Sequence, residues 1–304
     1  MLPIYSDQAH LLISVLPQVA KEPCFALKGG TAINLFVRNM PRLSVDIDLS
    51  YLPVEDRDTS LNNIDTALNN IASNIPKAIP GSTINRSNLT GTGYCIRLLI
   101  SRSDITIKVE VSPVLRGTVH PAQEKELSAN AEKEFGYVKM QLLSFEDLYA
   151  GKLCAALDRQ HPRDLFDIHY LLNTEGITES IKNTFLVYLI SHNRPIAELL
   201  APRPQDISAL YESEFKGMTY EDVSLDELYQ TRDKIVETIH NGLNENDRKL
   251  LLSLKEGKPK WELFAFPQAA SLPAVKWKLH NLGKMTSQKR KDALRKLEDV
   301  LSRK

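Results

Sequence analysis

The chain has 304 residues, of which 42% are hydrophobic and 25% charged, so it is long enough for two domains of ordinary size. No apolar run reaches the roughly 18 residues of a membrane helix, and MLPIYSDQAHLLISVLP has neither a basic start nor a small-residue cleavage site, which argues against membrane insertion and secretion. The three cysteines are Cys24, Cys95 and Cys154. Their odd number and wide spacing exclude a disulfide framework and a zinc pattern, and indicate buried thiols in a reducing cytoplasm.

The first elements surround a glycine pair. Helical spacing of apolar residues predicts a helix over 6–21, ended by Pro23. A short buried strand over 24–28 runs into Gly29 and Gly30. A second helix is expected over 31–38, with Thr31 as its N-cap and Pro41 as its stop. The next strand, 45–49, has acidic and apolar residues on opposite faces.

The later elements divide the chain by type of secondary structure. A helix over 58–75 should end at Pro76, and strands 94–100 and 105–111 are patterned as a hairpin, with one more strand at 138–142. Ser144 resembles a helix cap, and helices over 145–158 and 163–173 begin an all-helical portion. The fold class predicted is α+β. It comprises a mixed sheet with helices over residues 1–142 and a helical bundle over 143–304.

Asp46 and Asp48 are the first candidates for chemistry. Residues two apart on a strand point to the same side, so their carboxylates should lie together. A surface strand with one polar face explains this pattern equally well. Glu110 adds a third carboxylate if its strand pairs beside theirs, and Mg²⁺ takes a few such oxygens while keeping positions for water and phosphate. The three acids therefore indicate a metal site.

Gly29 and Gly30 are the candidate phosphate site. Two glycines at the start of a helix expose N–H groups that can hold the β- and γ-phosphates of a nucleotide. A simple turn is the alternative. The segment is neither a P-loop, because no Gly-Lys-Ser/Thr follows at the required spacing, nor a dinucleotide fingerprint.

A second group of candidate residues lies in the helical portion. Lys152 precedes Arg163, Asp164 and Asp167, and the two aspartates share a helix face. A structural network of cations and carboxylates explains this pattern. The functional alternative is that Lys152 contacts a triphosphate and that the residues over 163–167 hold Lys152 in place. His161 and His169 lie in no zinc-ligand context.

The C-terminal segment is strongly basic although the whole chain has zero net charge. Residues 276–304 contain ten Lys or Arg against three Asp or Glu, a net charge of +7. Such a block attracts a polyanion, but a solvated helix face has the same composition. In the polyanion interpretation, the residues expected to bind it are Lys284, Lys289, Arg290 and Lys291.

In combination these segments resemble the AbiEii, or MenT-type, nucleotidyltransferase toxins of the DNA polymerase β-like superfamily. The first motif is similar over Lys28-Gly-Gly-Thr-Ala and Arg42-Leu-Ser-Val-Asp-Ile-Asp-Leu, and the later motifs over 152–159 and 163–167. Leu272-Pro-Ala-Val-Lys-Trp is also similar, so the resemblance covers the chain in order.

The resemblance implies a metal-dependent nucleotidyltransferase of a toxin–antitoxin or abortive-infection (phage defence) system. It would use an NTP with Mg²⁺ or Mn²⁺ to add nucleotides, in some members to the 3′ end of tRNA, and RNA would then be the polyanion that the basic segment binds. Its partner would be a separate AbiEi-like antitoxin, a DNA-binding repressor protein. It implies Asp46 and Asp48 as metal ligands and Asp167, then Asp164, as the acids of the last motif. The residues implied at the nucleotide are Lys28, Gly29, Gly30, Thr31, Ser44, Lys152, Arg163 and Asp164. Thr31 and Glu110 depart from the more usual Ser and Asp but keep the functional group.

Three alternatives share these residues. A transferase acting on a protein or small molecule would have the same NTP-binding half of the site. A kinase could use the same groups to position a γ-phosphate. A non-catalytic binding module is disfavoured because Asp46, Asp48, Lys152 and Asp167 are all present. The motifs favour one cleft, with the glycine pair and its aspartates in one half and the helical residues in the other.

Overall fold

The structure is a computed structural model that describes residues 3–302. The chain forms two compact units. The first is built from the chain up to Leu148 together with Phe215–Asp222, and the second comprises Tyr149–Glu214 and the chain from Val223 onwards. Within residues 3–302, no helix is both long and apolar enough to cross a membrane.

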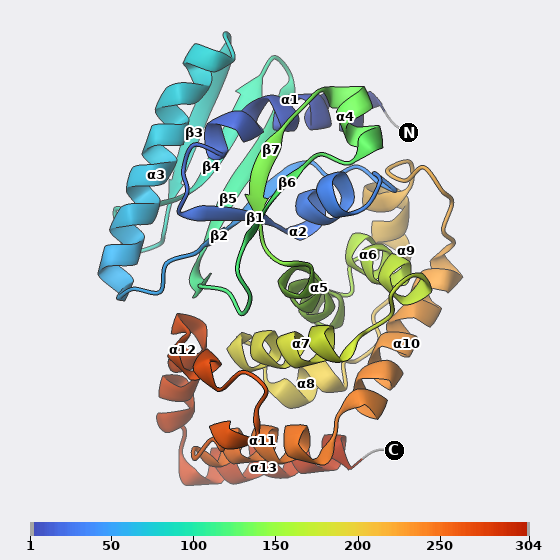
Figure 1. The fold of residues 1–304 in the computed structure, drawn as a ribbon. Helices are drawn as coiled ribbons and strands as arrows, with labels where there is room; N and C mark the ends of the chain where they lie inside the picture. The colour runs from blue at the N-terminus through green and yellow to red at the C-terminus, as the bar shows by residue number, and fades with distance from the viewer. Residues whose placement is uncertain (1–2, 303–304) are drawn as a thin grey trace. The chain divides into compact units, whose positions relative to one another are not determined.

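A seven-stranded mixed sheet forms the centre of the first unit (Figure 1). Its order is β3-β4-β5-β2-β1-β7-β6, with β2 parallel to β5, β1 parallel to β7 and the other neighbours antiparallel. The strands are β1 (Phe25–Lys28), β2 (Asp46–Tyr51), β3 (Ser82–Asn88), β4 (Cys95–Arg102), β5 (Ile105–Arg116), β6 (Gln123–Glu126) and β7 (Lys139–Leu142). The expected β4–β5 hairpin is confirmed, and β5 lies beside β2.

One face of this sheet is apolar and covered by helices. Ile47, Val109 and Leu98 form a row across β2, β5 and β4, and all three are fully buried. Helix α1 (Pro3–Val19) packs on β5, and α3 (Arg57–Ala78) packs on β4 (Figure 1). Because side chains alternate along a strand, burying this row leaves the neighbouring residues on the opposite face. That opposite face contains the acidic residues.

Three elements of the first unit were not expected from the sequence. They are the edge strands β3 and β6 and the short helix α4 (Ala129–Phe135). The edge strands consist of STINRSN and QEKE, which lack the apolar alternation of the central strands because most of their side chains face solvent. Polar residues suit an exposed edge, where they disfavour pairing with another chain.

Helix boundaries differ from the sequence prediction in three places. Helix α1 spans Pro3–Val19 where 6–21 was expected. Pro76 does not end its helix, because α3 continues to Ala78 and the Ile79 N–H donates to the Ile75 carbonyl. Pro76 removes only its own N–H hydrogen bond, and the helix continues because later residues keep theirs. Thr31 is not an N-cap, because α2 (Gly29–Thr31) begins at Gly29, after Lys28, and continues as a π-helical segment, Ala32–Val37.

The second unit is helical, in agreement with the predicted fold class. Ser144 does cap α5 (Phe145–Arg159), since its hydroxyl accepts a hydrogen bond from the Asp147 N–H. α6 packs on α10, α11 on α13, and α12 on α7. The other helices are α6 (Pro162–Asn173), α7 (Glu179–Ser191), α8 (Ile196–Leu200), α9 (Ser208–Leu210), α10 (Leu225–Gly242), α11 (Glu245–Glu256), α12 (Pro273–Gly283) and α13 (Ser287–Leu301), with a π-helical turn at Tyr211–Phe215 and 3₁₀ turns at Trp261–Leu263 and Pro267–Ser271.

Candidate functional site

A row of charged residues crosses the polar face of the sheet. Asp48 on β2 pairs in register with Lys28 on β1 and with Glu110 on β5, and Glu110 pairs with Arg97 on β4. Residues in register on neighbouring strands point to the same face. The row across β1, β2, β5 and β4 therefore consists of Lys28, Asp48, Glu110 and Arg97. Asp46 lies on the same face of β2, opposite Lys108.

Glu110 is held by two cations. Arg97 Nη2 lies 2.5 Å from Glu110 Oε1, and Lys108 Nζ lies 3.0 Å from Oε2. Burial alone would raise the pKa of Glu110, but the bonds to Arg97 and Lys108 outweigh burial and lower it. Glu110 is therefore ionised near neutral pH, and both its oxygens are engaged. Within residues 3–302, Asp48 has neither a hydrogen bond nor an ion pair.

Gly29 and Gly30 lie in close contact with the neighbouring side chains. Gly29 has φ +74°, and a Cβ there would lie 2.9 Å from Asp48 Oδ2. A Cβ on Gly30 would lie 2.7 Å from Arg42 Nη2 and 3.0 Å from Ser44 Oγ. Both positions therefore need glycine, Gly29 for its backbone and both for lack of space. The resulting cradle has a carboxylate on one side and a guanidinium on the other.

Thr31 and Ser44 link this cradle to strand β2. Thr31 Oγ1 lies 2.5 Å from the Asp46 carbonyl oxygen and 2.9 Å from Ser44 Oγ. A carbonyl can only accept, so the Thr31 hydroxyl donates to it and the Ser44 hydroxyl can donate to Thr31. Both side chains are buried. This pair fixes the start of α2 against the start of β2, which positions the glycines beside the aspartates.

The donor set fits a divalent cation that binds together with phosphate. Asp46 and Asp48 supply two carboxylates on one face, and Mg²⁺ commonly takes one or two carboxylates and completes its shell with water and phosphate oxygens. Across residues 3–302, no group of three or more His, Cys, Asp or Glu is arranged to hold a metal ion. To become a third ligand of such a cation, Glu110 would have to give up its ion pair with Arg97 or with Lys108.

The second unit contains a buried ionic cluster. Lys152 Nζ on α5 lies 2.8 Å from Asp164 Oδ1 and 3.0 Å from Asp167 Oδ2 on α6. Arg159 Nε adds a contact of 2.5 Å to Asp164 Oδ2. Burial would raise the pKa of Asp164, but Lys152 and Arg159 bring it well below its usual value. The sequence prediction that these residues act as a network is confirmed for Lys152, Asp164 and Asp167.

Arg163 does not join this ionic cluster. Its guanidinium lies 3.3 Å from Glu214 Oε2 and near the His161 ring, so Arg163 does not hold Lys152 or the two aspartates. Asp164 instead takes its second cation from Arg159, which projects from the end of α5. His161 caps α6 by accepting a hydrogen bond from the Arg163 N–H.

The predicted RNA-binding residues differ in accessibility. Lys284, Lys289 and Lys291 are exposed. Arg290 is half-buried, and its Nη2 donates to the Leu282 carbonyl at 2.8 Å. Arg290 therefore supports the junction between α12 and α13. Arg303 and Lys304, part of the basic segment, lie outside the described residues.

The sequence analysis missed three residues of the first unit's polar face. Arg97 and Lys108 hold Glu110, and Arg42 packs over Gly30 while its Nη1 donates to the Leu43 carbonyl. For Arg97 and Lys108 the signal was available, because both alternate with apolar residues in strands that had been predicted. Arg42 begins a segment that resembles the family's first motif, but no periodic pattern gave it a role. It follows an irregular loop, and it is buried against the returning segment Phe215–Asp222, with Thr219 as its bridge partner.

Comparison with known proteins identifies the fold. The chain can be superposed on MenT4, a nucleotidyltransferase toxin from Mycobacterium tuberculosis H37Rv, with a TM-score of 0.58 and 15% identity over 98% of this chain and 92% of that chain. No curated protein matches the sequence. At this identity the structural likeness shows the fold, which is that of a nucleotidyltransferase toxin.

The family follows from the sequence itself. The family model "Nucleotidyl transferase AbiEii toxin, Type IV TA system" matches residues 10–281. The chain therefore belongs to the AbiEii family of nucleotidyltransferase toxins of type IV toxin–antitoxin systems. The resemblance noted from the motifs is confirmed, and so is the expectation that the chain is an enzyme.

Proposed function

We propose that this toxin transfers nucleotides from an NTP to the 3′ end of an RNA, in particular a tRNA. The observation that carries the proposal is the position of Asp46 and Asp48 beside the cradle of Gly29 and Gly30. The exposed lysines of the basic C-terminal segment support RNA as the acceptor, because its phosphates form a dense polyanion.

In the reaction proposed, the 3′-hydroxyl oxygen attacks the α-phosphorus of the NTP. The new bond forms as the bond from that phosphorus to its bridging oxygen breaks, pyrophosphate leaves, and the hydroxyl proton passes to solvent. A divalent cation, Mg²⁺ or Mn²⁺, held by Asp46 and Asp48 would offset the charge of the triphosphate. The N–H groups of Gly29 and Gly30 would hold phosphate oxygens, and Lys28 and Ser44 flank them. Lys152 and Asp167 are proposed as residues required for the same reaction.

The test is label transfer from each of four α-labelled NTPs in the presence of Mg²⁺ and total cellular RNA. The wild-type chain should label RNA. Asp46→Asn and Asp48→Asn should each lower labelling by about 100-fold or more, because each removes a ligand charge where transition-state charge is offset. Asp104→Asn, in the exposed β4–β5 turn, is the matched control and should label normally. Labelling by both site variants at the wild-type rate would contradict the proposal.

The same reactions distinguish the other transferases. Labelled protein in place of labelled RNA would identify a protein acceptor, and label transferred only from the γ-position would identify a kinase. Expression of the Asp46→Asn variant in growing cells completes the test. The proposal requires that this variant does not inhibit growth, and that a separate antitoxin protein protects cells from the wild-type toxin.

A further inference from the structure

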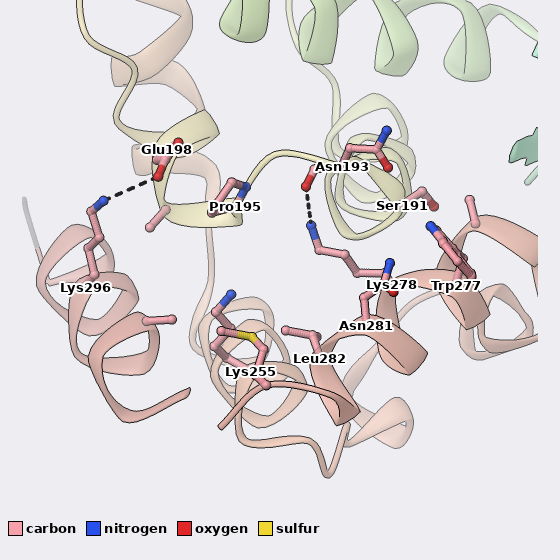
Figure 2. Close-up of a pocket in the computed structure, with 14 residues that line it drawn as sticks. Ser191, Asn193, Pro195, Glu198, Lys255, Trp277, Lys278, Asn281, Leu282 and Lys296 are labelled. Carbon is pink, nitrogen blue, oxygen red and sulfur yellow. Dashed lines mark hydrogen bonds and ion pairs between the residues drawn. The ribbon is translucent and has the colours of Figure 1, made fainter. Parts of the chain in front are cut away.

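The second unit contains a cavity of about 370 Å³ that includes none of the residues proposed above to bind the NTP or the metal. It is lined by the end of α7, by α8 and by α11, α12 and α13 (Figure 2). Its charged lining residues are three lysines, Lys255, Lys278 and Lys296, against one acid, Glu198, which leaves a net charge of +2.

Lys278 has a structural explanation. Its Nζ donates to the backbone carbonyls of His192, Asn193 and Arg194, just past the end of α7, at 2.5, 3.4 and 2.9 Å. Three acceptors account for all three N–H bonds of the ammonium group. A cation at this position also interacts favourably with the carbonyl end of α7. Lys278 therefore anchors α12 to α7.

Lys255 has no such explanation. Its side chain, at the end of α11, is only 5% exposed, yet it has neither a hydrogen bond nor an ion pair within residues 3–302. Figure 2 shows its ammonium group pointing into the space between Pro195 and Lys278. Glu198 is paired with Lys296 at 3.4 Å. Lys255 Nζ is not among the fully buried side-chain atoms that lack a partner, so the ammonium group opens into the cavity, where a ligand can reach it.

The electrostatics around Lys255 favour an anion. Burial lowers the pKa of Lys255, with only Glu198 opposing it, and burial together with the charge of Lys255 lowers the pKa of Lys278 to about 8. Two like charges thus repel each other within one cavity, and a bound anion would relieve both. The cavity has lysines but no arginine. Lysine binds phosphate as a point charge, whereas bidentate binding of a carboxylate is typical of the arginine guanidinium, so this lining favours a phosphate.

The rim of the cavity adds a surface for an aromatic ring. Trp277 lines the cavity and is 51% exposed, with one face stacked on His280 at a centroid distance of 5.7 Å. Nucleobases stack on exposed aromatic rings of this kind. Asn281, one turn further along α12, lines the cavity as well and can donate a hydrogen bond.

We propose that this cavity is a second nucleotide-binding site, in which Lys255 binds a phosphate group and Trp277 stacks on the attached base. The ligand is a nucleotide phosphate, carried either by a free mononucleotide or by an RNA strand. The inference does not rest on the proposed reaction, since neither residue belongs to the transfer site.

The test measures binding to the full-length chain by calorimetry in EDTA, which removes the divalent cation needed at Asp46 and Asp48. The probes are AMP, a short single-stranded oligoribonucleotide, and adenosine as the probe without phosphate. Lys255→Met should weaken binding of the phosphate-bearing probes by about tenfold or more, as expected for loss of a charge-assisted hydrogen bond. Trp277→Leu should weaken binding of AMP more than binding of inorganic phosphate. Adenosine should bind much more weakly than AMP.

The controls separate this site from folding and from catalysis. Lys249→Met, on the exposed side of α11, removes the same charge and should bind normally. Lys255→Met should unfold at the wild-type temperature or above, because the largely buried side chain makes no hydrogen bond or ion pair within residues 3–302 that the substitution would remove. The Asp46→Asn chain should bind as wild type does. Binding of AMP would identify a mononucleotide site. Binding of the oligoribonucleotide without binding of AMP would identify an RNA site. Binding of both probes independent of Lys255, or a lower unfolding temperature for Lys255→Met, would overturn the proposal.

Discussion

The carboxylate of Asp48 lies directly over the Cα of Gly29, so closely that a β-carbon on Gly29 would meet Oδ2 at 2.9 Å. The two residues are brought together by the antiparallel pairing of β1 with β2, in which Lys28 is opposite Asp48. The carboxylate proposed to bind the metal and the backbone proposed to bind phosphate are thus adjacent because of strand register.

This contact makes Gly29 sensitive to a single methyl group. Gly29→Ala should lower the free energy of unfolding by about 1–2 kcal/mol, because φ is +74°, and should also abolish nucleotide transfer by displacing Asp48. Gly81→Ala is the matched control, since Gly81 has φ +81° and nothing within 4 Å of a Cβ. Urea unfolding and α-label transfer should show equal stability losses but lost activity only at Gly29. Equal activity in both variants would contradict this reading.

Glu110 should matter for transfer more than for stability. Glu110→Gln removes the charge next to Asp48, and we expect transfer to fall by at least about tenfold. The free energy of unfolding should change by less than about 1 kcal/mol, because its ion pairs are partly exposed. The control is Glu124→Gln on the edge strand β6, which loses an exposed ion pair with Lys139 on β7. Normal transfer by Glu110→Gln would assign Glu110 a purely structural role.

Loss of Lys152 should destabilise the second unit. Lys152→Met leaves Asp164 and Asp167, which are both 1% exposed, with less compensation, at a cost of about 3–5 kcal/mol. The double variant Lys152→Met with Asp167→Asn should recover part of this loss, because Arg159 still balances Asp164. Denaturant unfolding followed by circular dichroism measures both. A double variant less stable than the single one would show that the ion pairs are not the cause.

Acid should selectively weaken the same cluster. The folded pKa of Asp164 is lowered, so this carboxylate adds stability that is complete above its unfolded pKa of about 4. That stability is lost as the pH falls below this value towards the folded pKa. Asp164→Asn should therefore be less stable than wild type at pH 7, and the difference should shrink below pH 4. A constant difference between pH 7 and pH 3 in urea titrations would contradict the assignment.

RNA binding should depend on the exposed lysines of α13. Reversing Lys289 and Lys291 to Glu should weaken RNA binding and reduce its dependence on salt, because fewer phosphate counterions are released. Arg290 is left intact because it supports the α12–α13 junction. The control reverses Lys77 and Lys133, which are exposed in the first unit and give the same change in net charge. Equal RNA affinity of the two double variants would exclude α13 as the RNA surface, whereas NTP binding should be normal in both.

Local patterns were sufficient for the central elements of the fold. Alternation of apolar and charged residues identified the strands that became β2, β4 and β5, because each has one face in the core. Edge strands such as β3 have no buried face of this kind, so their sequence carries no such signal. Pro76 misled the prediction because a proline removes only its own N–H hydrogen bond, so a helix can continue past it where later residues keep theirs, as Ile79 does.

By itself the sequence determined the family and the α+β class, and it supplied the candidate residues of the proposed transfer site, since these follow from motif and periodicity. Only the tertiary structure decided which charged side chains contact one another. Glu110 meets Arg97 and Lys108, Asp164 turns to Arg159 instead of Arg163, and Lys255 is buried without a partner. The physical reason is that a charged residue's role depends on which charges and how much solvent surround it. Those surroundings come from strand register and helix packing between residues far apart in the chain.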